Sequence, residues 1–574
     1  MNLQRREMDT TRPFPWPQAT NELLPHTLFK LAAQYPSATY AEFPVNPHKI
    51  EDGYRKITFA EVANAVSAFA WWVEENIGKL QEEEKDGTRT LVYMGPNDIR
   101  YAVLCLGSVI AGYKMLFPSP RYGVEALVKL IESVDAKTML KPEIPIPVVK
   151  DVLSMKNMKT LQIPSVEQLL TSKSESYPYD KTYQRNSREP FVCLHTSGTT
   201  GFPKPILWTH EWTNSVAQTM YLTAPLGYEL DQELLYGSAN GRGMRAMFLF
   251  PPFHASGMIG MILFPLQLGV TPIYPPTWVT PASGVESALA ALDVVATRDG
   301  GVGVDCVTIV PPCVEYLSKS PEVLQRLSQR TQQVGWGGGS VSNHASEFVA
   351  AQVPVLNVMA STELGIWPSI RRNDANSLQS AYWEYTTLHP ALNIHFDPVS
   401  TSTDGVTLYE AVMHRNDGKE HGGYVQPIFS IFPDAKERRL GDLFTKHPED
   451  SERWKHYGRA DDLLVFLTNE KFFPTAAEQR IASHACVAEV AMIGTGRPRA
   501  SFIVRLEDGK GVHEIWDTVE EVNKSSPVYA RVGKDMILTV KEPFPKTAKG
   551  TVQKKALLNL YEKELDTLYG GSSG

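Results

Sequence analysis

Residues 194–205 read LHTSGTTGFPKP, a stretch that predicts a loop able to surround an anion. Gly198 and Gly201 let the backbone approach a ligand closely, and Lys204 adds a positive charge. Neighbouring hydroxyl side chains offer further donors, namely Thr196, Ser197, Thr199 and Thr200. No Gly-Lys-Ser/Thr follows at the Walker spacing, so the stretch is not a P-loop of that type. A Ser/Thr/Gly-rich surface turn is the alternative interpretation.

The composition indicates a chain that can bury several cores. It has 574 residues, of which 43% are hydrophobic, and a formal net charge of −8. This charge disfavours a nucleic-acid partner held by bulk electrostatics. Five cysteines without paired spacing predict reduced, mostly buried thiols in a cytoplasmic protein. The most apolar run, residues 247–276, is interrupted by prolines, so we expect a buried strand-and-loop segment and no membrane partner.

Alternating helix and strand patterns predict an α/β fold. Thr58 and Glu61 have capping-box spacing ahead of an apolar stripe, so a helix is expected from about Thr58 to Gly78. A β-rich run, a glycine-ended helix and another buried strand follow, which is typical of a largely parallel sheet covered by helices. Short strands separated by charged helices begin after residues 458–462, where we expect a domain boundary.

Four further glycine- or acid-containing motifs follow the first loop. They are GWGGGS at residues 335–340, MASTE at 359–363, LGDLF at 440–444 and GRADD at 458–462. Each is weak alone, because glycine clusters and Gly-Asp pairs are usually turns. In this order, and together with TSGTTGFPK, they resemble the adenylate-forming superfamily of acyl-CoA synthetases, luciferases and adenylation domains of nonribosomal peptide synthetases (NRPS). The resemblance covers roughly residues 25–560.

The resemblance implies a large multi-sheet N-terminal AMP-binding core and a small mobile α+β C-terminal lid domain. The expected ranges are 1–458 for the core, 459–560 for the lid and 561–574 for a linker or tail. ATP and Mg²⁺ are the implied cofactors, with Glu363 holding the metal ion. Nucleotide-binding candidates are Thr196, Ser197, Gly198, Thr199, Thr200, Gly201, Gly337, Gly338, Gly339, Met359, Ala360, Asp442 and Arg459.

The resemblance also implies individual roles within this set. Thr362 and Lys204 would contact phosphate, and Asp442 would accept hydrogen bonds from both ribose hydroxyls. Arg459 would meet ribose or phosphate oxygens, and Asp461 would be the interdomain hinge. The family's usual residues are replaced at several positions of these motifs, by Met359, Ala360, Arg438 and Leu440.

A lysine-rich stretch near the C-terminus, PFPKTAKGTVQKKAL at residues 543–557, resembles the superfamily's last core motif, Pro-x-Thr-x-x-Gly-Lys. The alignment places Thr551 where the family has its catalytic lysine. Lys549 stands nearby, and its long flexible side chain could cover the offset, so we nominate it as the adenylation lysine. Lys546 is the less favoured substitute, and Lys554 and Lys555 are expected to be solvated.

Several details resemble fungal NRPS-like enzymes of the carboxylic acid reductase type. They are His195, the PKPI string, FPSPR at residues 117–121 and QPIFSIFPDAKERRLGDLFTKHP. This resemblance implies acyl transfer to a pantetheine thiol, on a carrier domain in cis or in trans, or on coenzyme A. No GxGxxG follows a predicted strand and no carrier motif is found, so neither reduction nor carrier loading in cis is expected within these residues.

The substrate pocket is expected to take a carboxylic acid that is not an α-amino acid. His254 stands where the amino-acid-activating domains place an Asp, and it would instead orient the substrate carboxylate, although a plain core histidine is the alternative. The other candidate lining residues suit an aryl, aliphatic or betaine-like acid; they are Ala255, Met258, Val310, Trp336, Val358 and Ile366. A free-standing acid–CoA ligase and a catalytically lapsed nucleotide- or acyl-binding module remain alternatives.

Overall fold

Parallel strands dominate the first half of the chain, as the alternating pattern predicts. The computed structural model describes residues 16–18, 21–80, 90–197, 202–231, 244–276, 280–301, 303–339, 341–373, 383–401, 406–468, 470–546 and 552–570. A six-stranded sheet has the order β6-β5-β3-β4-β7-β8 and is parallel except for the β7–β8 hairpin. Its strands are β3 (Thr90–Tyr93), β4 (Lys114–Leu116), β5 (Thr138–Lys141), β6 (Lys159–Gln162), β7 (Pro190–Ser197) and β8 (Pro203–Thr209).

A seven-stranded sheet forms the other half of the core. It has the order β14-β13-β12-β10-β11-β1-β2, and only the edge pair β1–β2 is antiparallel. Its strands are β1 (Thr39–Pro44), β2 (Tyr54–Thr58), β10 (Arg245–Phe248), β11 (Thr271–Ile273), β12 (Val304–Ile309), β13 (Thr331–Gly337) and β14 (Val355–Val358).

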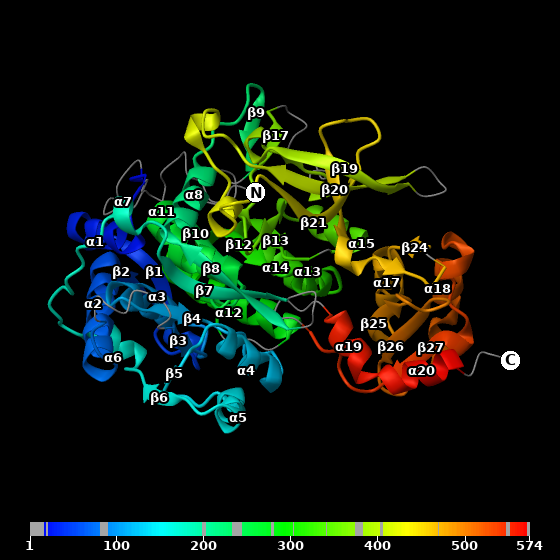
Figure 1. Cartoon of the computed structure of the whole chain (residues 1–574), viewed down its shortest axis with the longest axis horizontal. Helices are drawn as coiled ribbons and strands as arrows, with labels where there is room; N and C mark the ends of the chain where they lie inside the picture. The colour runs from blue at the N-terminus through cyan, green and yellow to red at the C-terminus, as the bar shows by residue number, and fades with distance from the viewer. Residues whose placement is uncertain are drawn as a thin grey trace.

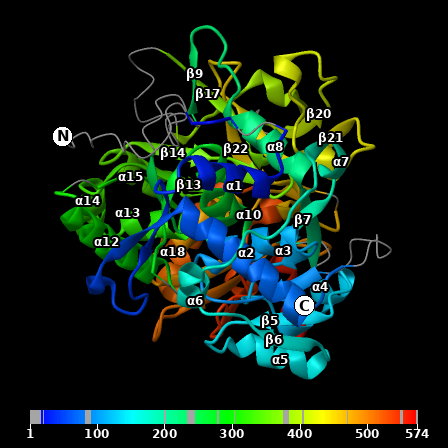
Figure 2. The same cartoon turned by 90° about the vertical axis from the view of Figure 1, so that its left-hand side faces the viewer.

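Two helices lie between these sheets. Helix α2 (Phe59–Asn76) contacts β1 and β2, helix α3 (Arg100–Ile110) contacts β4 and β7, and the helices contact each other (Figure 2). Every residue of α3 is buried as a result. The remaining longer core helices are α1 (Leu24–Gln34), α4 (Val124–Ser133), α5 (Pro147–Met155), α6 (Val166–Thr171), α8 (His210–Met220), α12 (Pro281–Arg298), α13 (Pro311–Ser318), α14 (Pro321–Ser328) and α15 (Asn343–Ala350).

The start of α2 confirms the predicted capping box. The Thr58 hydroxyl accepts a hydrogen bond from the Glu61 backbone N–H at 3.2 Å, and the Glu61 carboxylate accepts one from the Thr58 N–H at 2.7 Å. The helix ends at Asn76, shortly before Gly78, whose φ of 120° lies in the region that favours glycine.

The apolar run 247–276 is more helical than expected. It continues from β10 into α10 (Ala255–Met258), a π-helical turn (Ile259–Leu263) and α11 (Phe264–Gln267) before reaching β11. A segment that is apolar on all sides can be buried as a helix just as well as a strand, so the prediction of a strand-and-loop segment was incomplete. Within the described ranges, no helix combines the length and apolarity that crossing a membrane would require.

An antiparallel sheet connects the core to the C-terminal domain. It consists of β19 (Ile394–Thr401), β20 (Thr407–His414), β21 (Glu437–Lys446) and β22 (Trp454–Arg459), in chain order. Short strands form two- and three-stranded sheets elsewhere: β9 (Tyr228–Leu230), β15 (Ala360–Ser361), β16 (Gly365–Ile366), β17 (Ser369–Arg372), β18 (Thr387–Leu388), β23 (Leu464–Val465) and β24 (Lys471–Phe472).

The smaller C-terminal domain is built on a three-stranded sheet (Figure 1). Hydrophobic clusters pack on both faces of this sheet. Phe502 and Val504 belong to one cluster, and Ile503 belongs to the other, as alternation along a strand requires. The elements are β25 (Val487–Ile493), β26 (Ser501–Leu506), β27 (Ile537–Val540), α17 (Thr475–Ala482), α18 (Val512–Ser525), α19 (Lys554–Leu560) and α20 (Glu562–Gly570).

Helix α20 differs from the linker or tail expected from residue 561 onward. Its Leu565 is buried in the same cluster as Ile503, so residues 562–570 pack as part of the domain. The large multi-sheet core with a smaller C-terminal domain confirms the expected fold class. All five cysteines are unpaired, and all but Cys486 are buried, in agreement with the prediction of free thiols.

Candidate active site

The first motif lies at the tip of the β7–β8 hairpin. Thr196 is paired with Lys204 and Ser197 with Pro203, so residues 198–201 connect the two strands. Those connecting residues, Gly198, Thr199, Thr200 and Gly201, lie outside the described part of the chain. Lys204 is exposed beside them on β8. Thr196 and Lys204 are thus paired across the two strands at this end of the hairpin.

Two stacked tryptophans join this hairpin to the turn that carries Thr362 and Glu363. The Trp208 indole donates to the Thr362 carbonyl at 2.8 Å, and the Trp212 indole donates to the Glu363 carbonyl at 2.9 Å. Their rings stack with centroids 3.8 Å apart, and both are fully buried. The sequence analysis missed these positioning residues. Their signal is a pair of tryptophans four residues apart directly after the loop.

The glycine-rich motif and the MASTE motif follow neighbouring strand ends. β13 and β14 are parallel, with Gly337 opposite Val358, so Gly338 and Met359 leave the sheet at the same edge. A Cβ at Gly337 would lie 2.5 Å from the Val358 carbonyl oxygen, so the approach requires glycine. The carboxyl ends of parallel strands are where such sheets bind ligands.

A cavity at this edge joins residues predicted for the acid to residues predicted for the nucleotide. Ala255, Val358 and Ile366 line it together with Gly337, Gly338, Ala360 and Thr362, and no described lining residue is charged. Met258, Val310 and Trp336 are buried in the core and do not line it. Sequence analysis missed Phe248, Phe250, Ser256, Ile259, Phe264, Thr308 and Ser361.

His254 lies beside a second, deeply buried histidine. Its ring is 6.3 Å from that of His195 and 5.1 Å from Phe253. His195 accepts a hydrogen bond at Nε2 from the Ser119 backbone N–H at 3.0 Å, which places the proton of the neutral ring on Nδ1. Burial lowers the pKa of His195 to about 4, so the ring is uncharged at neutral pH.

The Asp442 carboxylate lies at a corner between β21 and β22. Its Oδ1 is 3.1 Å from His456 Nε2, and its Oδ2 accepts from Arg459 Nη1 at 3.1 Å. Arg459 also contacts Asp461 at 3.1 Å. Burial alone would lower the pKa of Arg459, but the carboxylates of Asp442, Asp461 and Glu363 raise it. The predicted ribose, phosphate and hinge residues therefore meet here, with His456 as an unpredicted member.

Arg438, one of the residues expected to depart from the family motif, packs on an aromatic ring. Its guanidinium lies 3.6 Å from the centroid of the Phe432 ring. Burial lowers the pKa of Arg438, although the Glu363 carboxylate opposes this shift. The negative charge of Glu363 thus favours the charged form of both guanidinium groups, because it acts to raise the pKa of Arg438 and of Arg459.

Glu363 fits a magnesium ion that is shared with phosphate. The described residues contain no group of three metal-ligating side chains. Mg²⁺ commonly binds one or two carboxylates and completes its shell with phosphate oxygens and water, so Glu363 alone on the protein side would be compatible with it.

The lysines of the C-terminal motif have different surroundings. Lys546 Nζ is 2.6 Å from Glu489, and Lys554 Nζ is 2.9 Å from Glu478. Lys549 and Thr551 lie outside the described residues, and the nomination of Lys549 stays a prediction.

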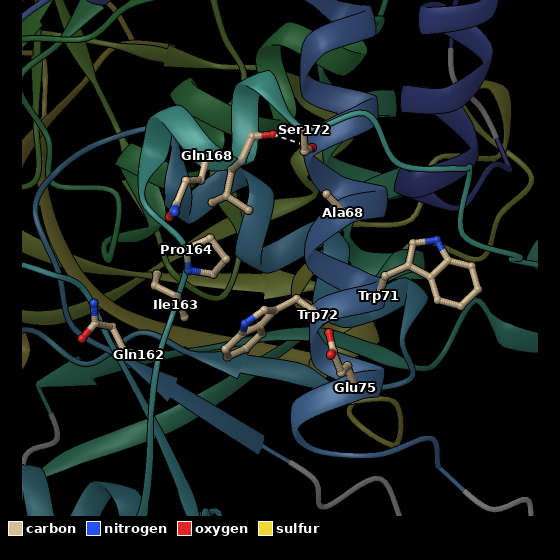
Figure 3. A pocket seen from close by; sticks show the side chains of 10 residues that line it. Ala68, Trp71, Trp72, Glu75, Gln162, Ile163, Pro164, Gln168 and Ser172 are labelled. Atoms are coloured by element: carbon tan, nitrogen blue, oxygen red, sulfur yellow. Dashed lines mark hydrogen bonds between the residues drawn. The ribbon is translucent and has the colours of Figure 1, made fainter.

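A larger open hollow lies between α2 and α6, and none of the predicted site residues lines it (Figure 3). Trp72 from α2 points towards Ile163 and Pro164, which follow β6, whereas the Trp71 ring projects from the other side of α2. The tryptophan rings make separate contacts, Trp71 with Tyr177 and Trp72 with Phe69.

Known proteins match this sequence and this fold. Residues 28–383 match the AMP-binding enzyme family, and residues 461–573 match the AMP-binding enzyme C-terminal domain. The isocyanide synthase-NRPS hybrid crmA of Aspergillus fumigatus is 30% identical over 95% of this chain and 33% of its own length. A carboxylic acid reductase of Neurospora crassa is 30% identical over 90% of this chain and 48% of its own length. The chain thus spans about half or less of these relatives.

Among solved structures, the O-succinylbenzoate coenzyme A synthetase of Bacillus subtilis, in complex with AMP, has a TM-score of 0.65 at 15% identity. The match covers 92% of this chain and 97% of that one, which shows a shared fold. The family match covers more than half of the chain. The chain therefore belongs to the AMP-binding enzyme family and is an adenylate-forming ligase.

Proposed function

We propose that the chain activates a carboxylic acid other than an α-amino acid and transfers it to a pantetheine thiol. In the first step a carboxylate oxygen attacks the α-phosphorus of ATP, the bond to the β-phosphate oxygen breaks, and pyrophosphate leaves. In the second step the sulfur attacks the acyl carbonyl, the thiol gives up its proton, and AMP leaves. Membership in the family supports the use of ATP.

The uncharged cavity carries this proposal. It extends from the apolar residues Ala255 and Val358 to Gly337 and Thr362 of the nucleotide motifs. A buried ammonium group needs a carboxylate partner, and the described lining residues provide none. We propose that the apolar body of the acid contacts this lining and that its carboxylate is oriented by His254, which precedes the lining residue Ala255 in the chain and is not itself a lining residue.

The polar residues around the cavity have separate proposed roles. Lys204 and the hairpin hydroxyl groups, with Thr362, bind phosphate, and Gly337 to Gly339, Met359 and Ala360 surround the adenine. Asp442 binds the ribose with the help of Arg459, and Glu363 holds Mg²⁺. A bound Mg²⁺ would neutralise charge on the phosphates. Lys549 reaches the substrate carboxylate and α-phosphate. Without a covalent enzyme intermediate, catalysis comes from positioning and charge stabilisation.

The acyl acceptor is proposed to be a carrier domain, in cis or in trans. The carboxylic acid reductase relative is about twice as long as the matched region, which supports an adenylation module within a larger reductase-type assembly. Between the half-reactions, a lid domain of residues 459–560 would rotate about Asp461.

Pyrophosphate release and hydroxamate formation, measured across aryl, aliphatic and betaine-like acids, test the proposal. Each acid is supplied with ATP and then with either a pantetheinylated carrier domain or free coenzyme A. We expect ATP-dependent turnover with a subset of acids and thioester formation on the carrier. Thioester formation only with free coenzyme A would indicate a free-standing ligase. No turnover with any acid would contradict the proposal and favour a binding module that has lost catalysis.

A further inference from the structure

The Asp442 carboxylate is held on both of its oxygens. Oδ1 accepts from Nε2 of His456, and Oδ2 accepts from Nη1 of Arg459, each at 3.1 Å. Because an ionised carboxylate only accepts hydrogen bonds, Nε2 of His456 must carry a proton in this contact. The Asp442 and His456 side chains are 14% and 23% exposed, so the pair is shielded from water without being sealed off.

A β-bulge brings both donors to the same carboxylate. Residues three apart on a regular strand point to opposite faces, so His456 and Arg459 would normally diverge. Here Leu443 is opposite Gly458 and Phe444 is opposite His456, which leaves Tyr457 as an extra residue in β22. The extra residue restores a common face for the two donors.

Packing fixes the plane of the His456 ring. Its centroid is 5.5 Å from that of Phe444, with the ring planes at 81°. Phe444 is fully buried, so this edge-to-face contact is anchored in the sheet. By contrast, Arg459 donates hydrogen bonds to Asp442, to Asp461 and to the Leu440 carbonyl. Only one of its contacts therefore orients the Asp442 carboxylate.

We propose that His456 is a positioning residue that aligns the Asp442 carboxylate for the two ribose hydroxyls of ATP. Each carboxylate oxygen has two acceptor sites, and the protein donors take one on each. One acceptor site remains on each oxygen, and the His456 and Arg459 contacts set the direction in which it points. This inference rests on the ribose role proposed above for Asp442.

Two substitutions of His456 separate its hydrogen bond from its packing. His456→Phe keeps an aromatic ring against Phe444 and removes the donor, whereas His456→Gln restores a neutral donor. We expect His456→Phe to raise the KM for ATP about tenfold with the KM for the acid unchanged, and His456→Gln to recover most of the loss. Calorimetric titration with ATP, without acid, should show the same ratio between the variants.

Deoxynucleotides provide the readout that a merely structural role would not change. If His456 acts through a ribose hydroxyl, a nucleotide without that hydroxyl should bind the variant and the wild type about equally well. The ratio of their KM values should therefore approach one with either 2′-deoxy-ATP or 3′-deoxy-ATP. His395→Gln is the matched control, because His395 is exposed on β19 of the same sheet. It should behave like the wild type with all three nucleotides.

The inference is overturned if His456→Phe leaves the KM for ATP unchanged or weakens all three nucleotides equally. Asp442→Asn identifies which step has failed. If Asp442→Asn raises the KM for ATP and His456→Phe does not, only the role of His456 is wrong. If neither Asp442→Asn nor the deoxynucleotides change affinity, the ribose role of Asp442 is wrong and the inference falls with it. Thermal melting of each variant checks that the fold is retained.

Discussion

In the large core, buried indole N–H groups donate hydrogen bonds to the turn that carries Thr362 and Glu363. In the C-terminal domain, by contrast, the lysines next to the expected catalytic segment form ion pairs. Trp208 and Trp212 donate to the carbonyls of that turn. Lys546 is paired with Glu489 instead. The core contacts shape a ligand site, and the lysine contact joins β25 to the segment after β27.

This difference separates residues that we propose to act on ligands from residues that hold a domain together. An ammonium group in contact with a nearly buried carboxylate would lose that partner if it moved to a substrate, and Glu489 would keep the ion pair with Arg505 but lose the one with Lys546. Lys546 is therefore a poor candidate for the chemistry. The comparison favours Lys549, the lysine that the sequence already nominates.

The largest expected effect is the loss of adenylation in Lys549→Ala. Removing a cation that stabilises the charge of the transition state should lower the rate of pyrophosphate release by about 10²- to 10³-fold. Thermal melting should accompany the assay, because a loss of adenylation counts as catalytic only if the variant stays folded. Lys555→Ala is the matched control from the same motif. A Lys549→Ala variant that adenylates normally would remove the assignment.

A smaller effect is expected from Ala255→Leu in the acid cavity. The added side-chain atoms would occupy space between Ala255 and Val358, so the KM for the acid should rise about tenfold. The KM for ATP should change less than the KM for the acid, because Ala255 is on α10 whereas Asp442 and Arg459, the proposed ribose contacts, are on β21 and β22. Val358→Ala should shift the preference towards larger acids. Equal changes in the KM for acid and ATP would show that the cavity is not an acid site.

Local sequence rules predicted much of the fold. The capping box at Thr58 and the parallel sheets follow from hydrogen-bonding side chains and apolar periodicity. The sequence did not reveal that residues 562–570 would pack as a helix. The burial of Leu565 depends on an apolar surface formed by distant residues such as Ile503, which no local pattern contains.

Motifs predicted the polar residues of the candidate site better than their supports. Asp442 from LGDLF and Arg459 and Asp461 from GRADD are expected from two separate motifs, and the structure brings them together. His456 was not predicted, because only the bulge at Tyr457 turns it towards Asp442, and a bulge has no reliable signal in one strand alone. Likewise, three predicted pocket residues line the cavity, while Phe248 and Phe250 line it from the end of β10 without any motif.

Lys546→Ala tests whether the contact between Lys546 and Glu489 stabilises the C-terminal domain without taking part in adenylation. Lys546 is 44% exposed, so water screens its attraction to Glu489, and we expect the free energy of unfolding to fall by only about 1 kcal/mol. Adenylation per folded molecule should be unchanged. Urea denaturation measures the first quantity and pyrophosphate release the second. A large loss of adenylation without a loss of stability would move the catalytic role to Lys546. The exposed Lys541→Ala provides a control.

The smallest effect is a dependence of stability on pH that comes from Glu489. Burial alone would raise the pKa of Glu489, but hydrogen bonds from Lys546, Arg505 and the Phe544 backbone N–H lower it. The unfolded chain, in which a glutamate has a pKa of about 4.3, therefore binds the proton more tightly than the folded chain. The stabilisation is complete well above this value and is lost as the pH falls through the lower pKa of the folded state.

Denaturation of the wild type and of Glu489→Gln between pH 6 and pH 3 isolates this contribution. We expect the difference in unfolding free energy between them to shrink by less than about 1 kcal/mol as the solution becomes acidic, because the amide cannot be protonated in this range. The stability of Lys546→Ala should also depend less on pH than that of the wild type, because the substitution removes one of the contacts that lower the pKa of Glu489. If the difference in unfolding free energy between the wild type and Glu489→Gln grows on acidification, burial outweighs the ion pairs in setting the pKa of Glu489. The contact between Lys546 and Glu489 would then not stabilise the C-terminal domain.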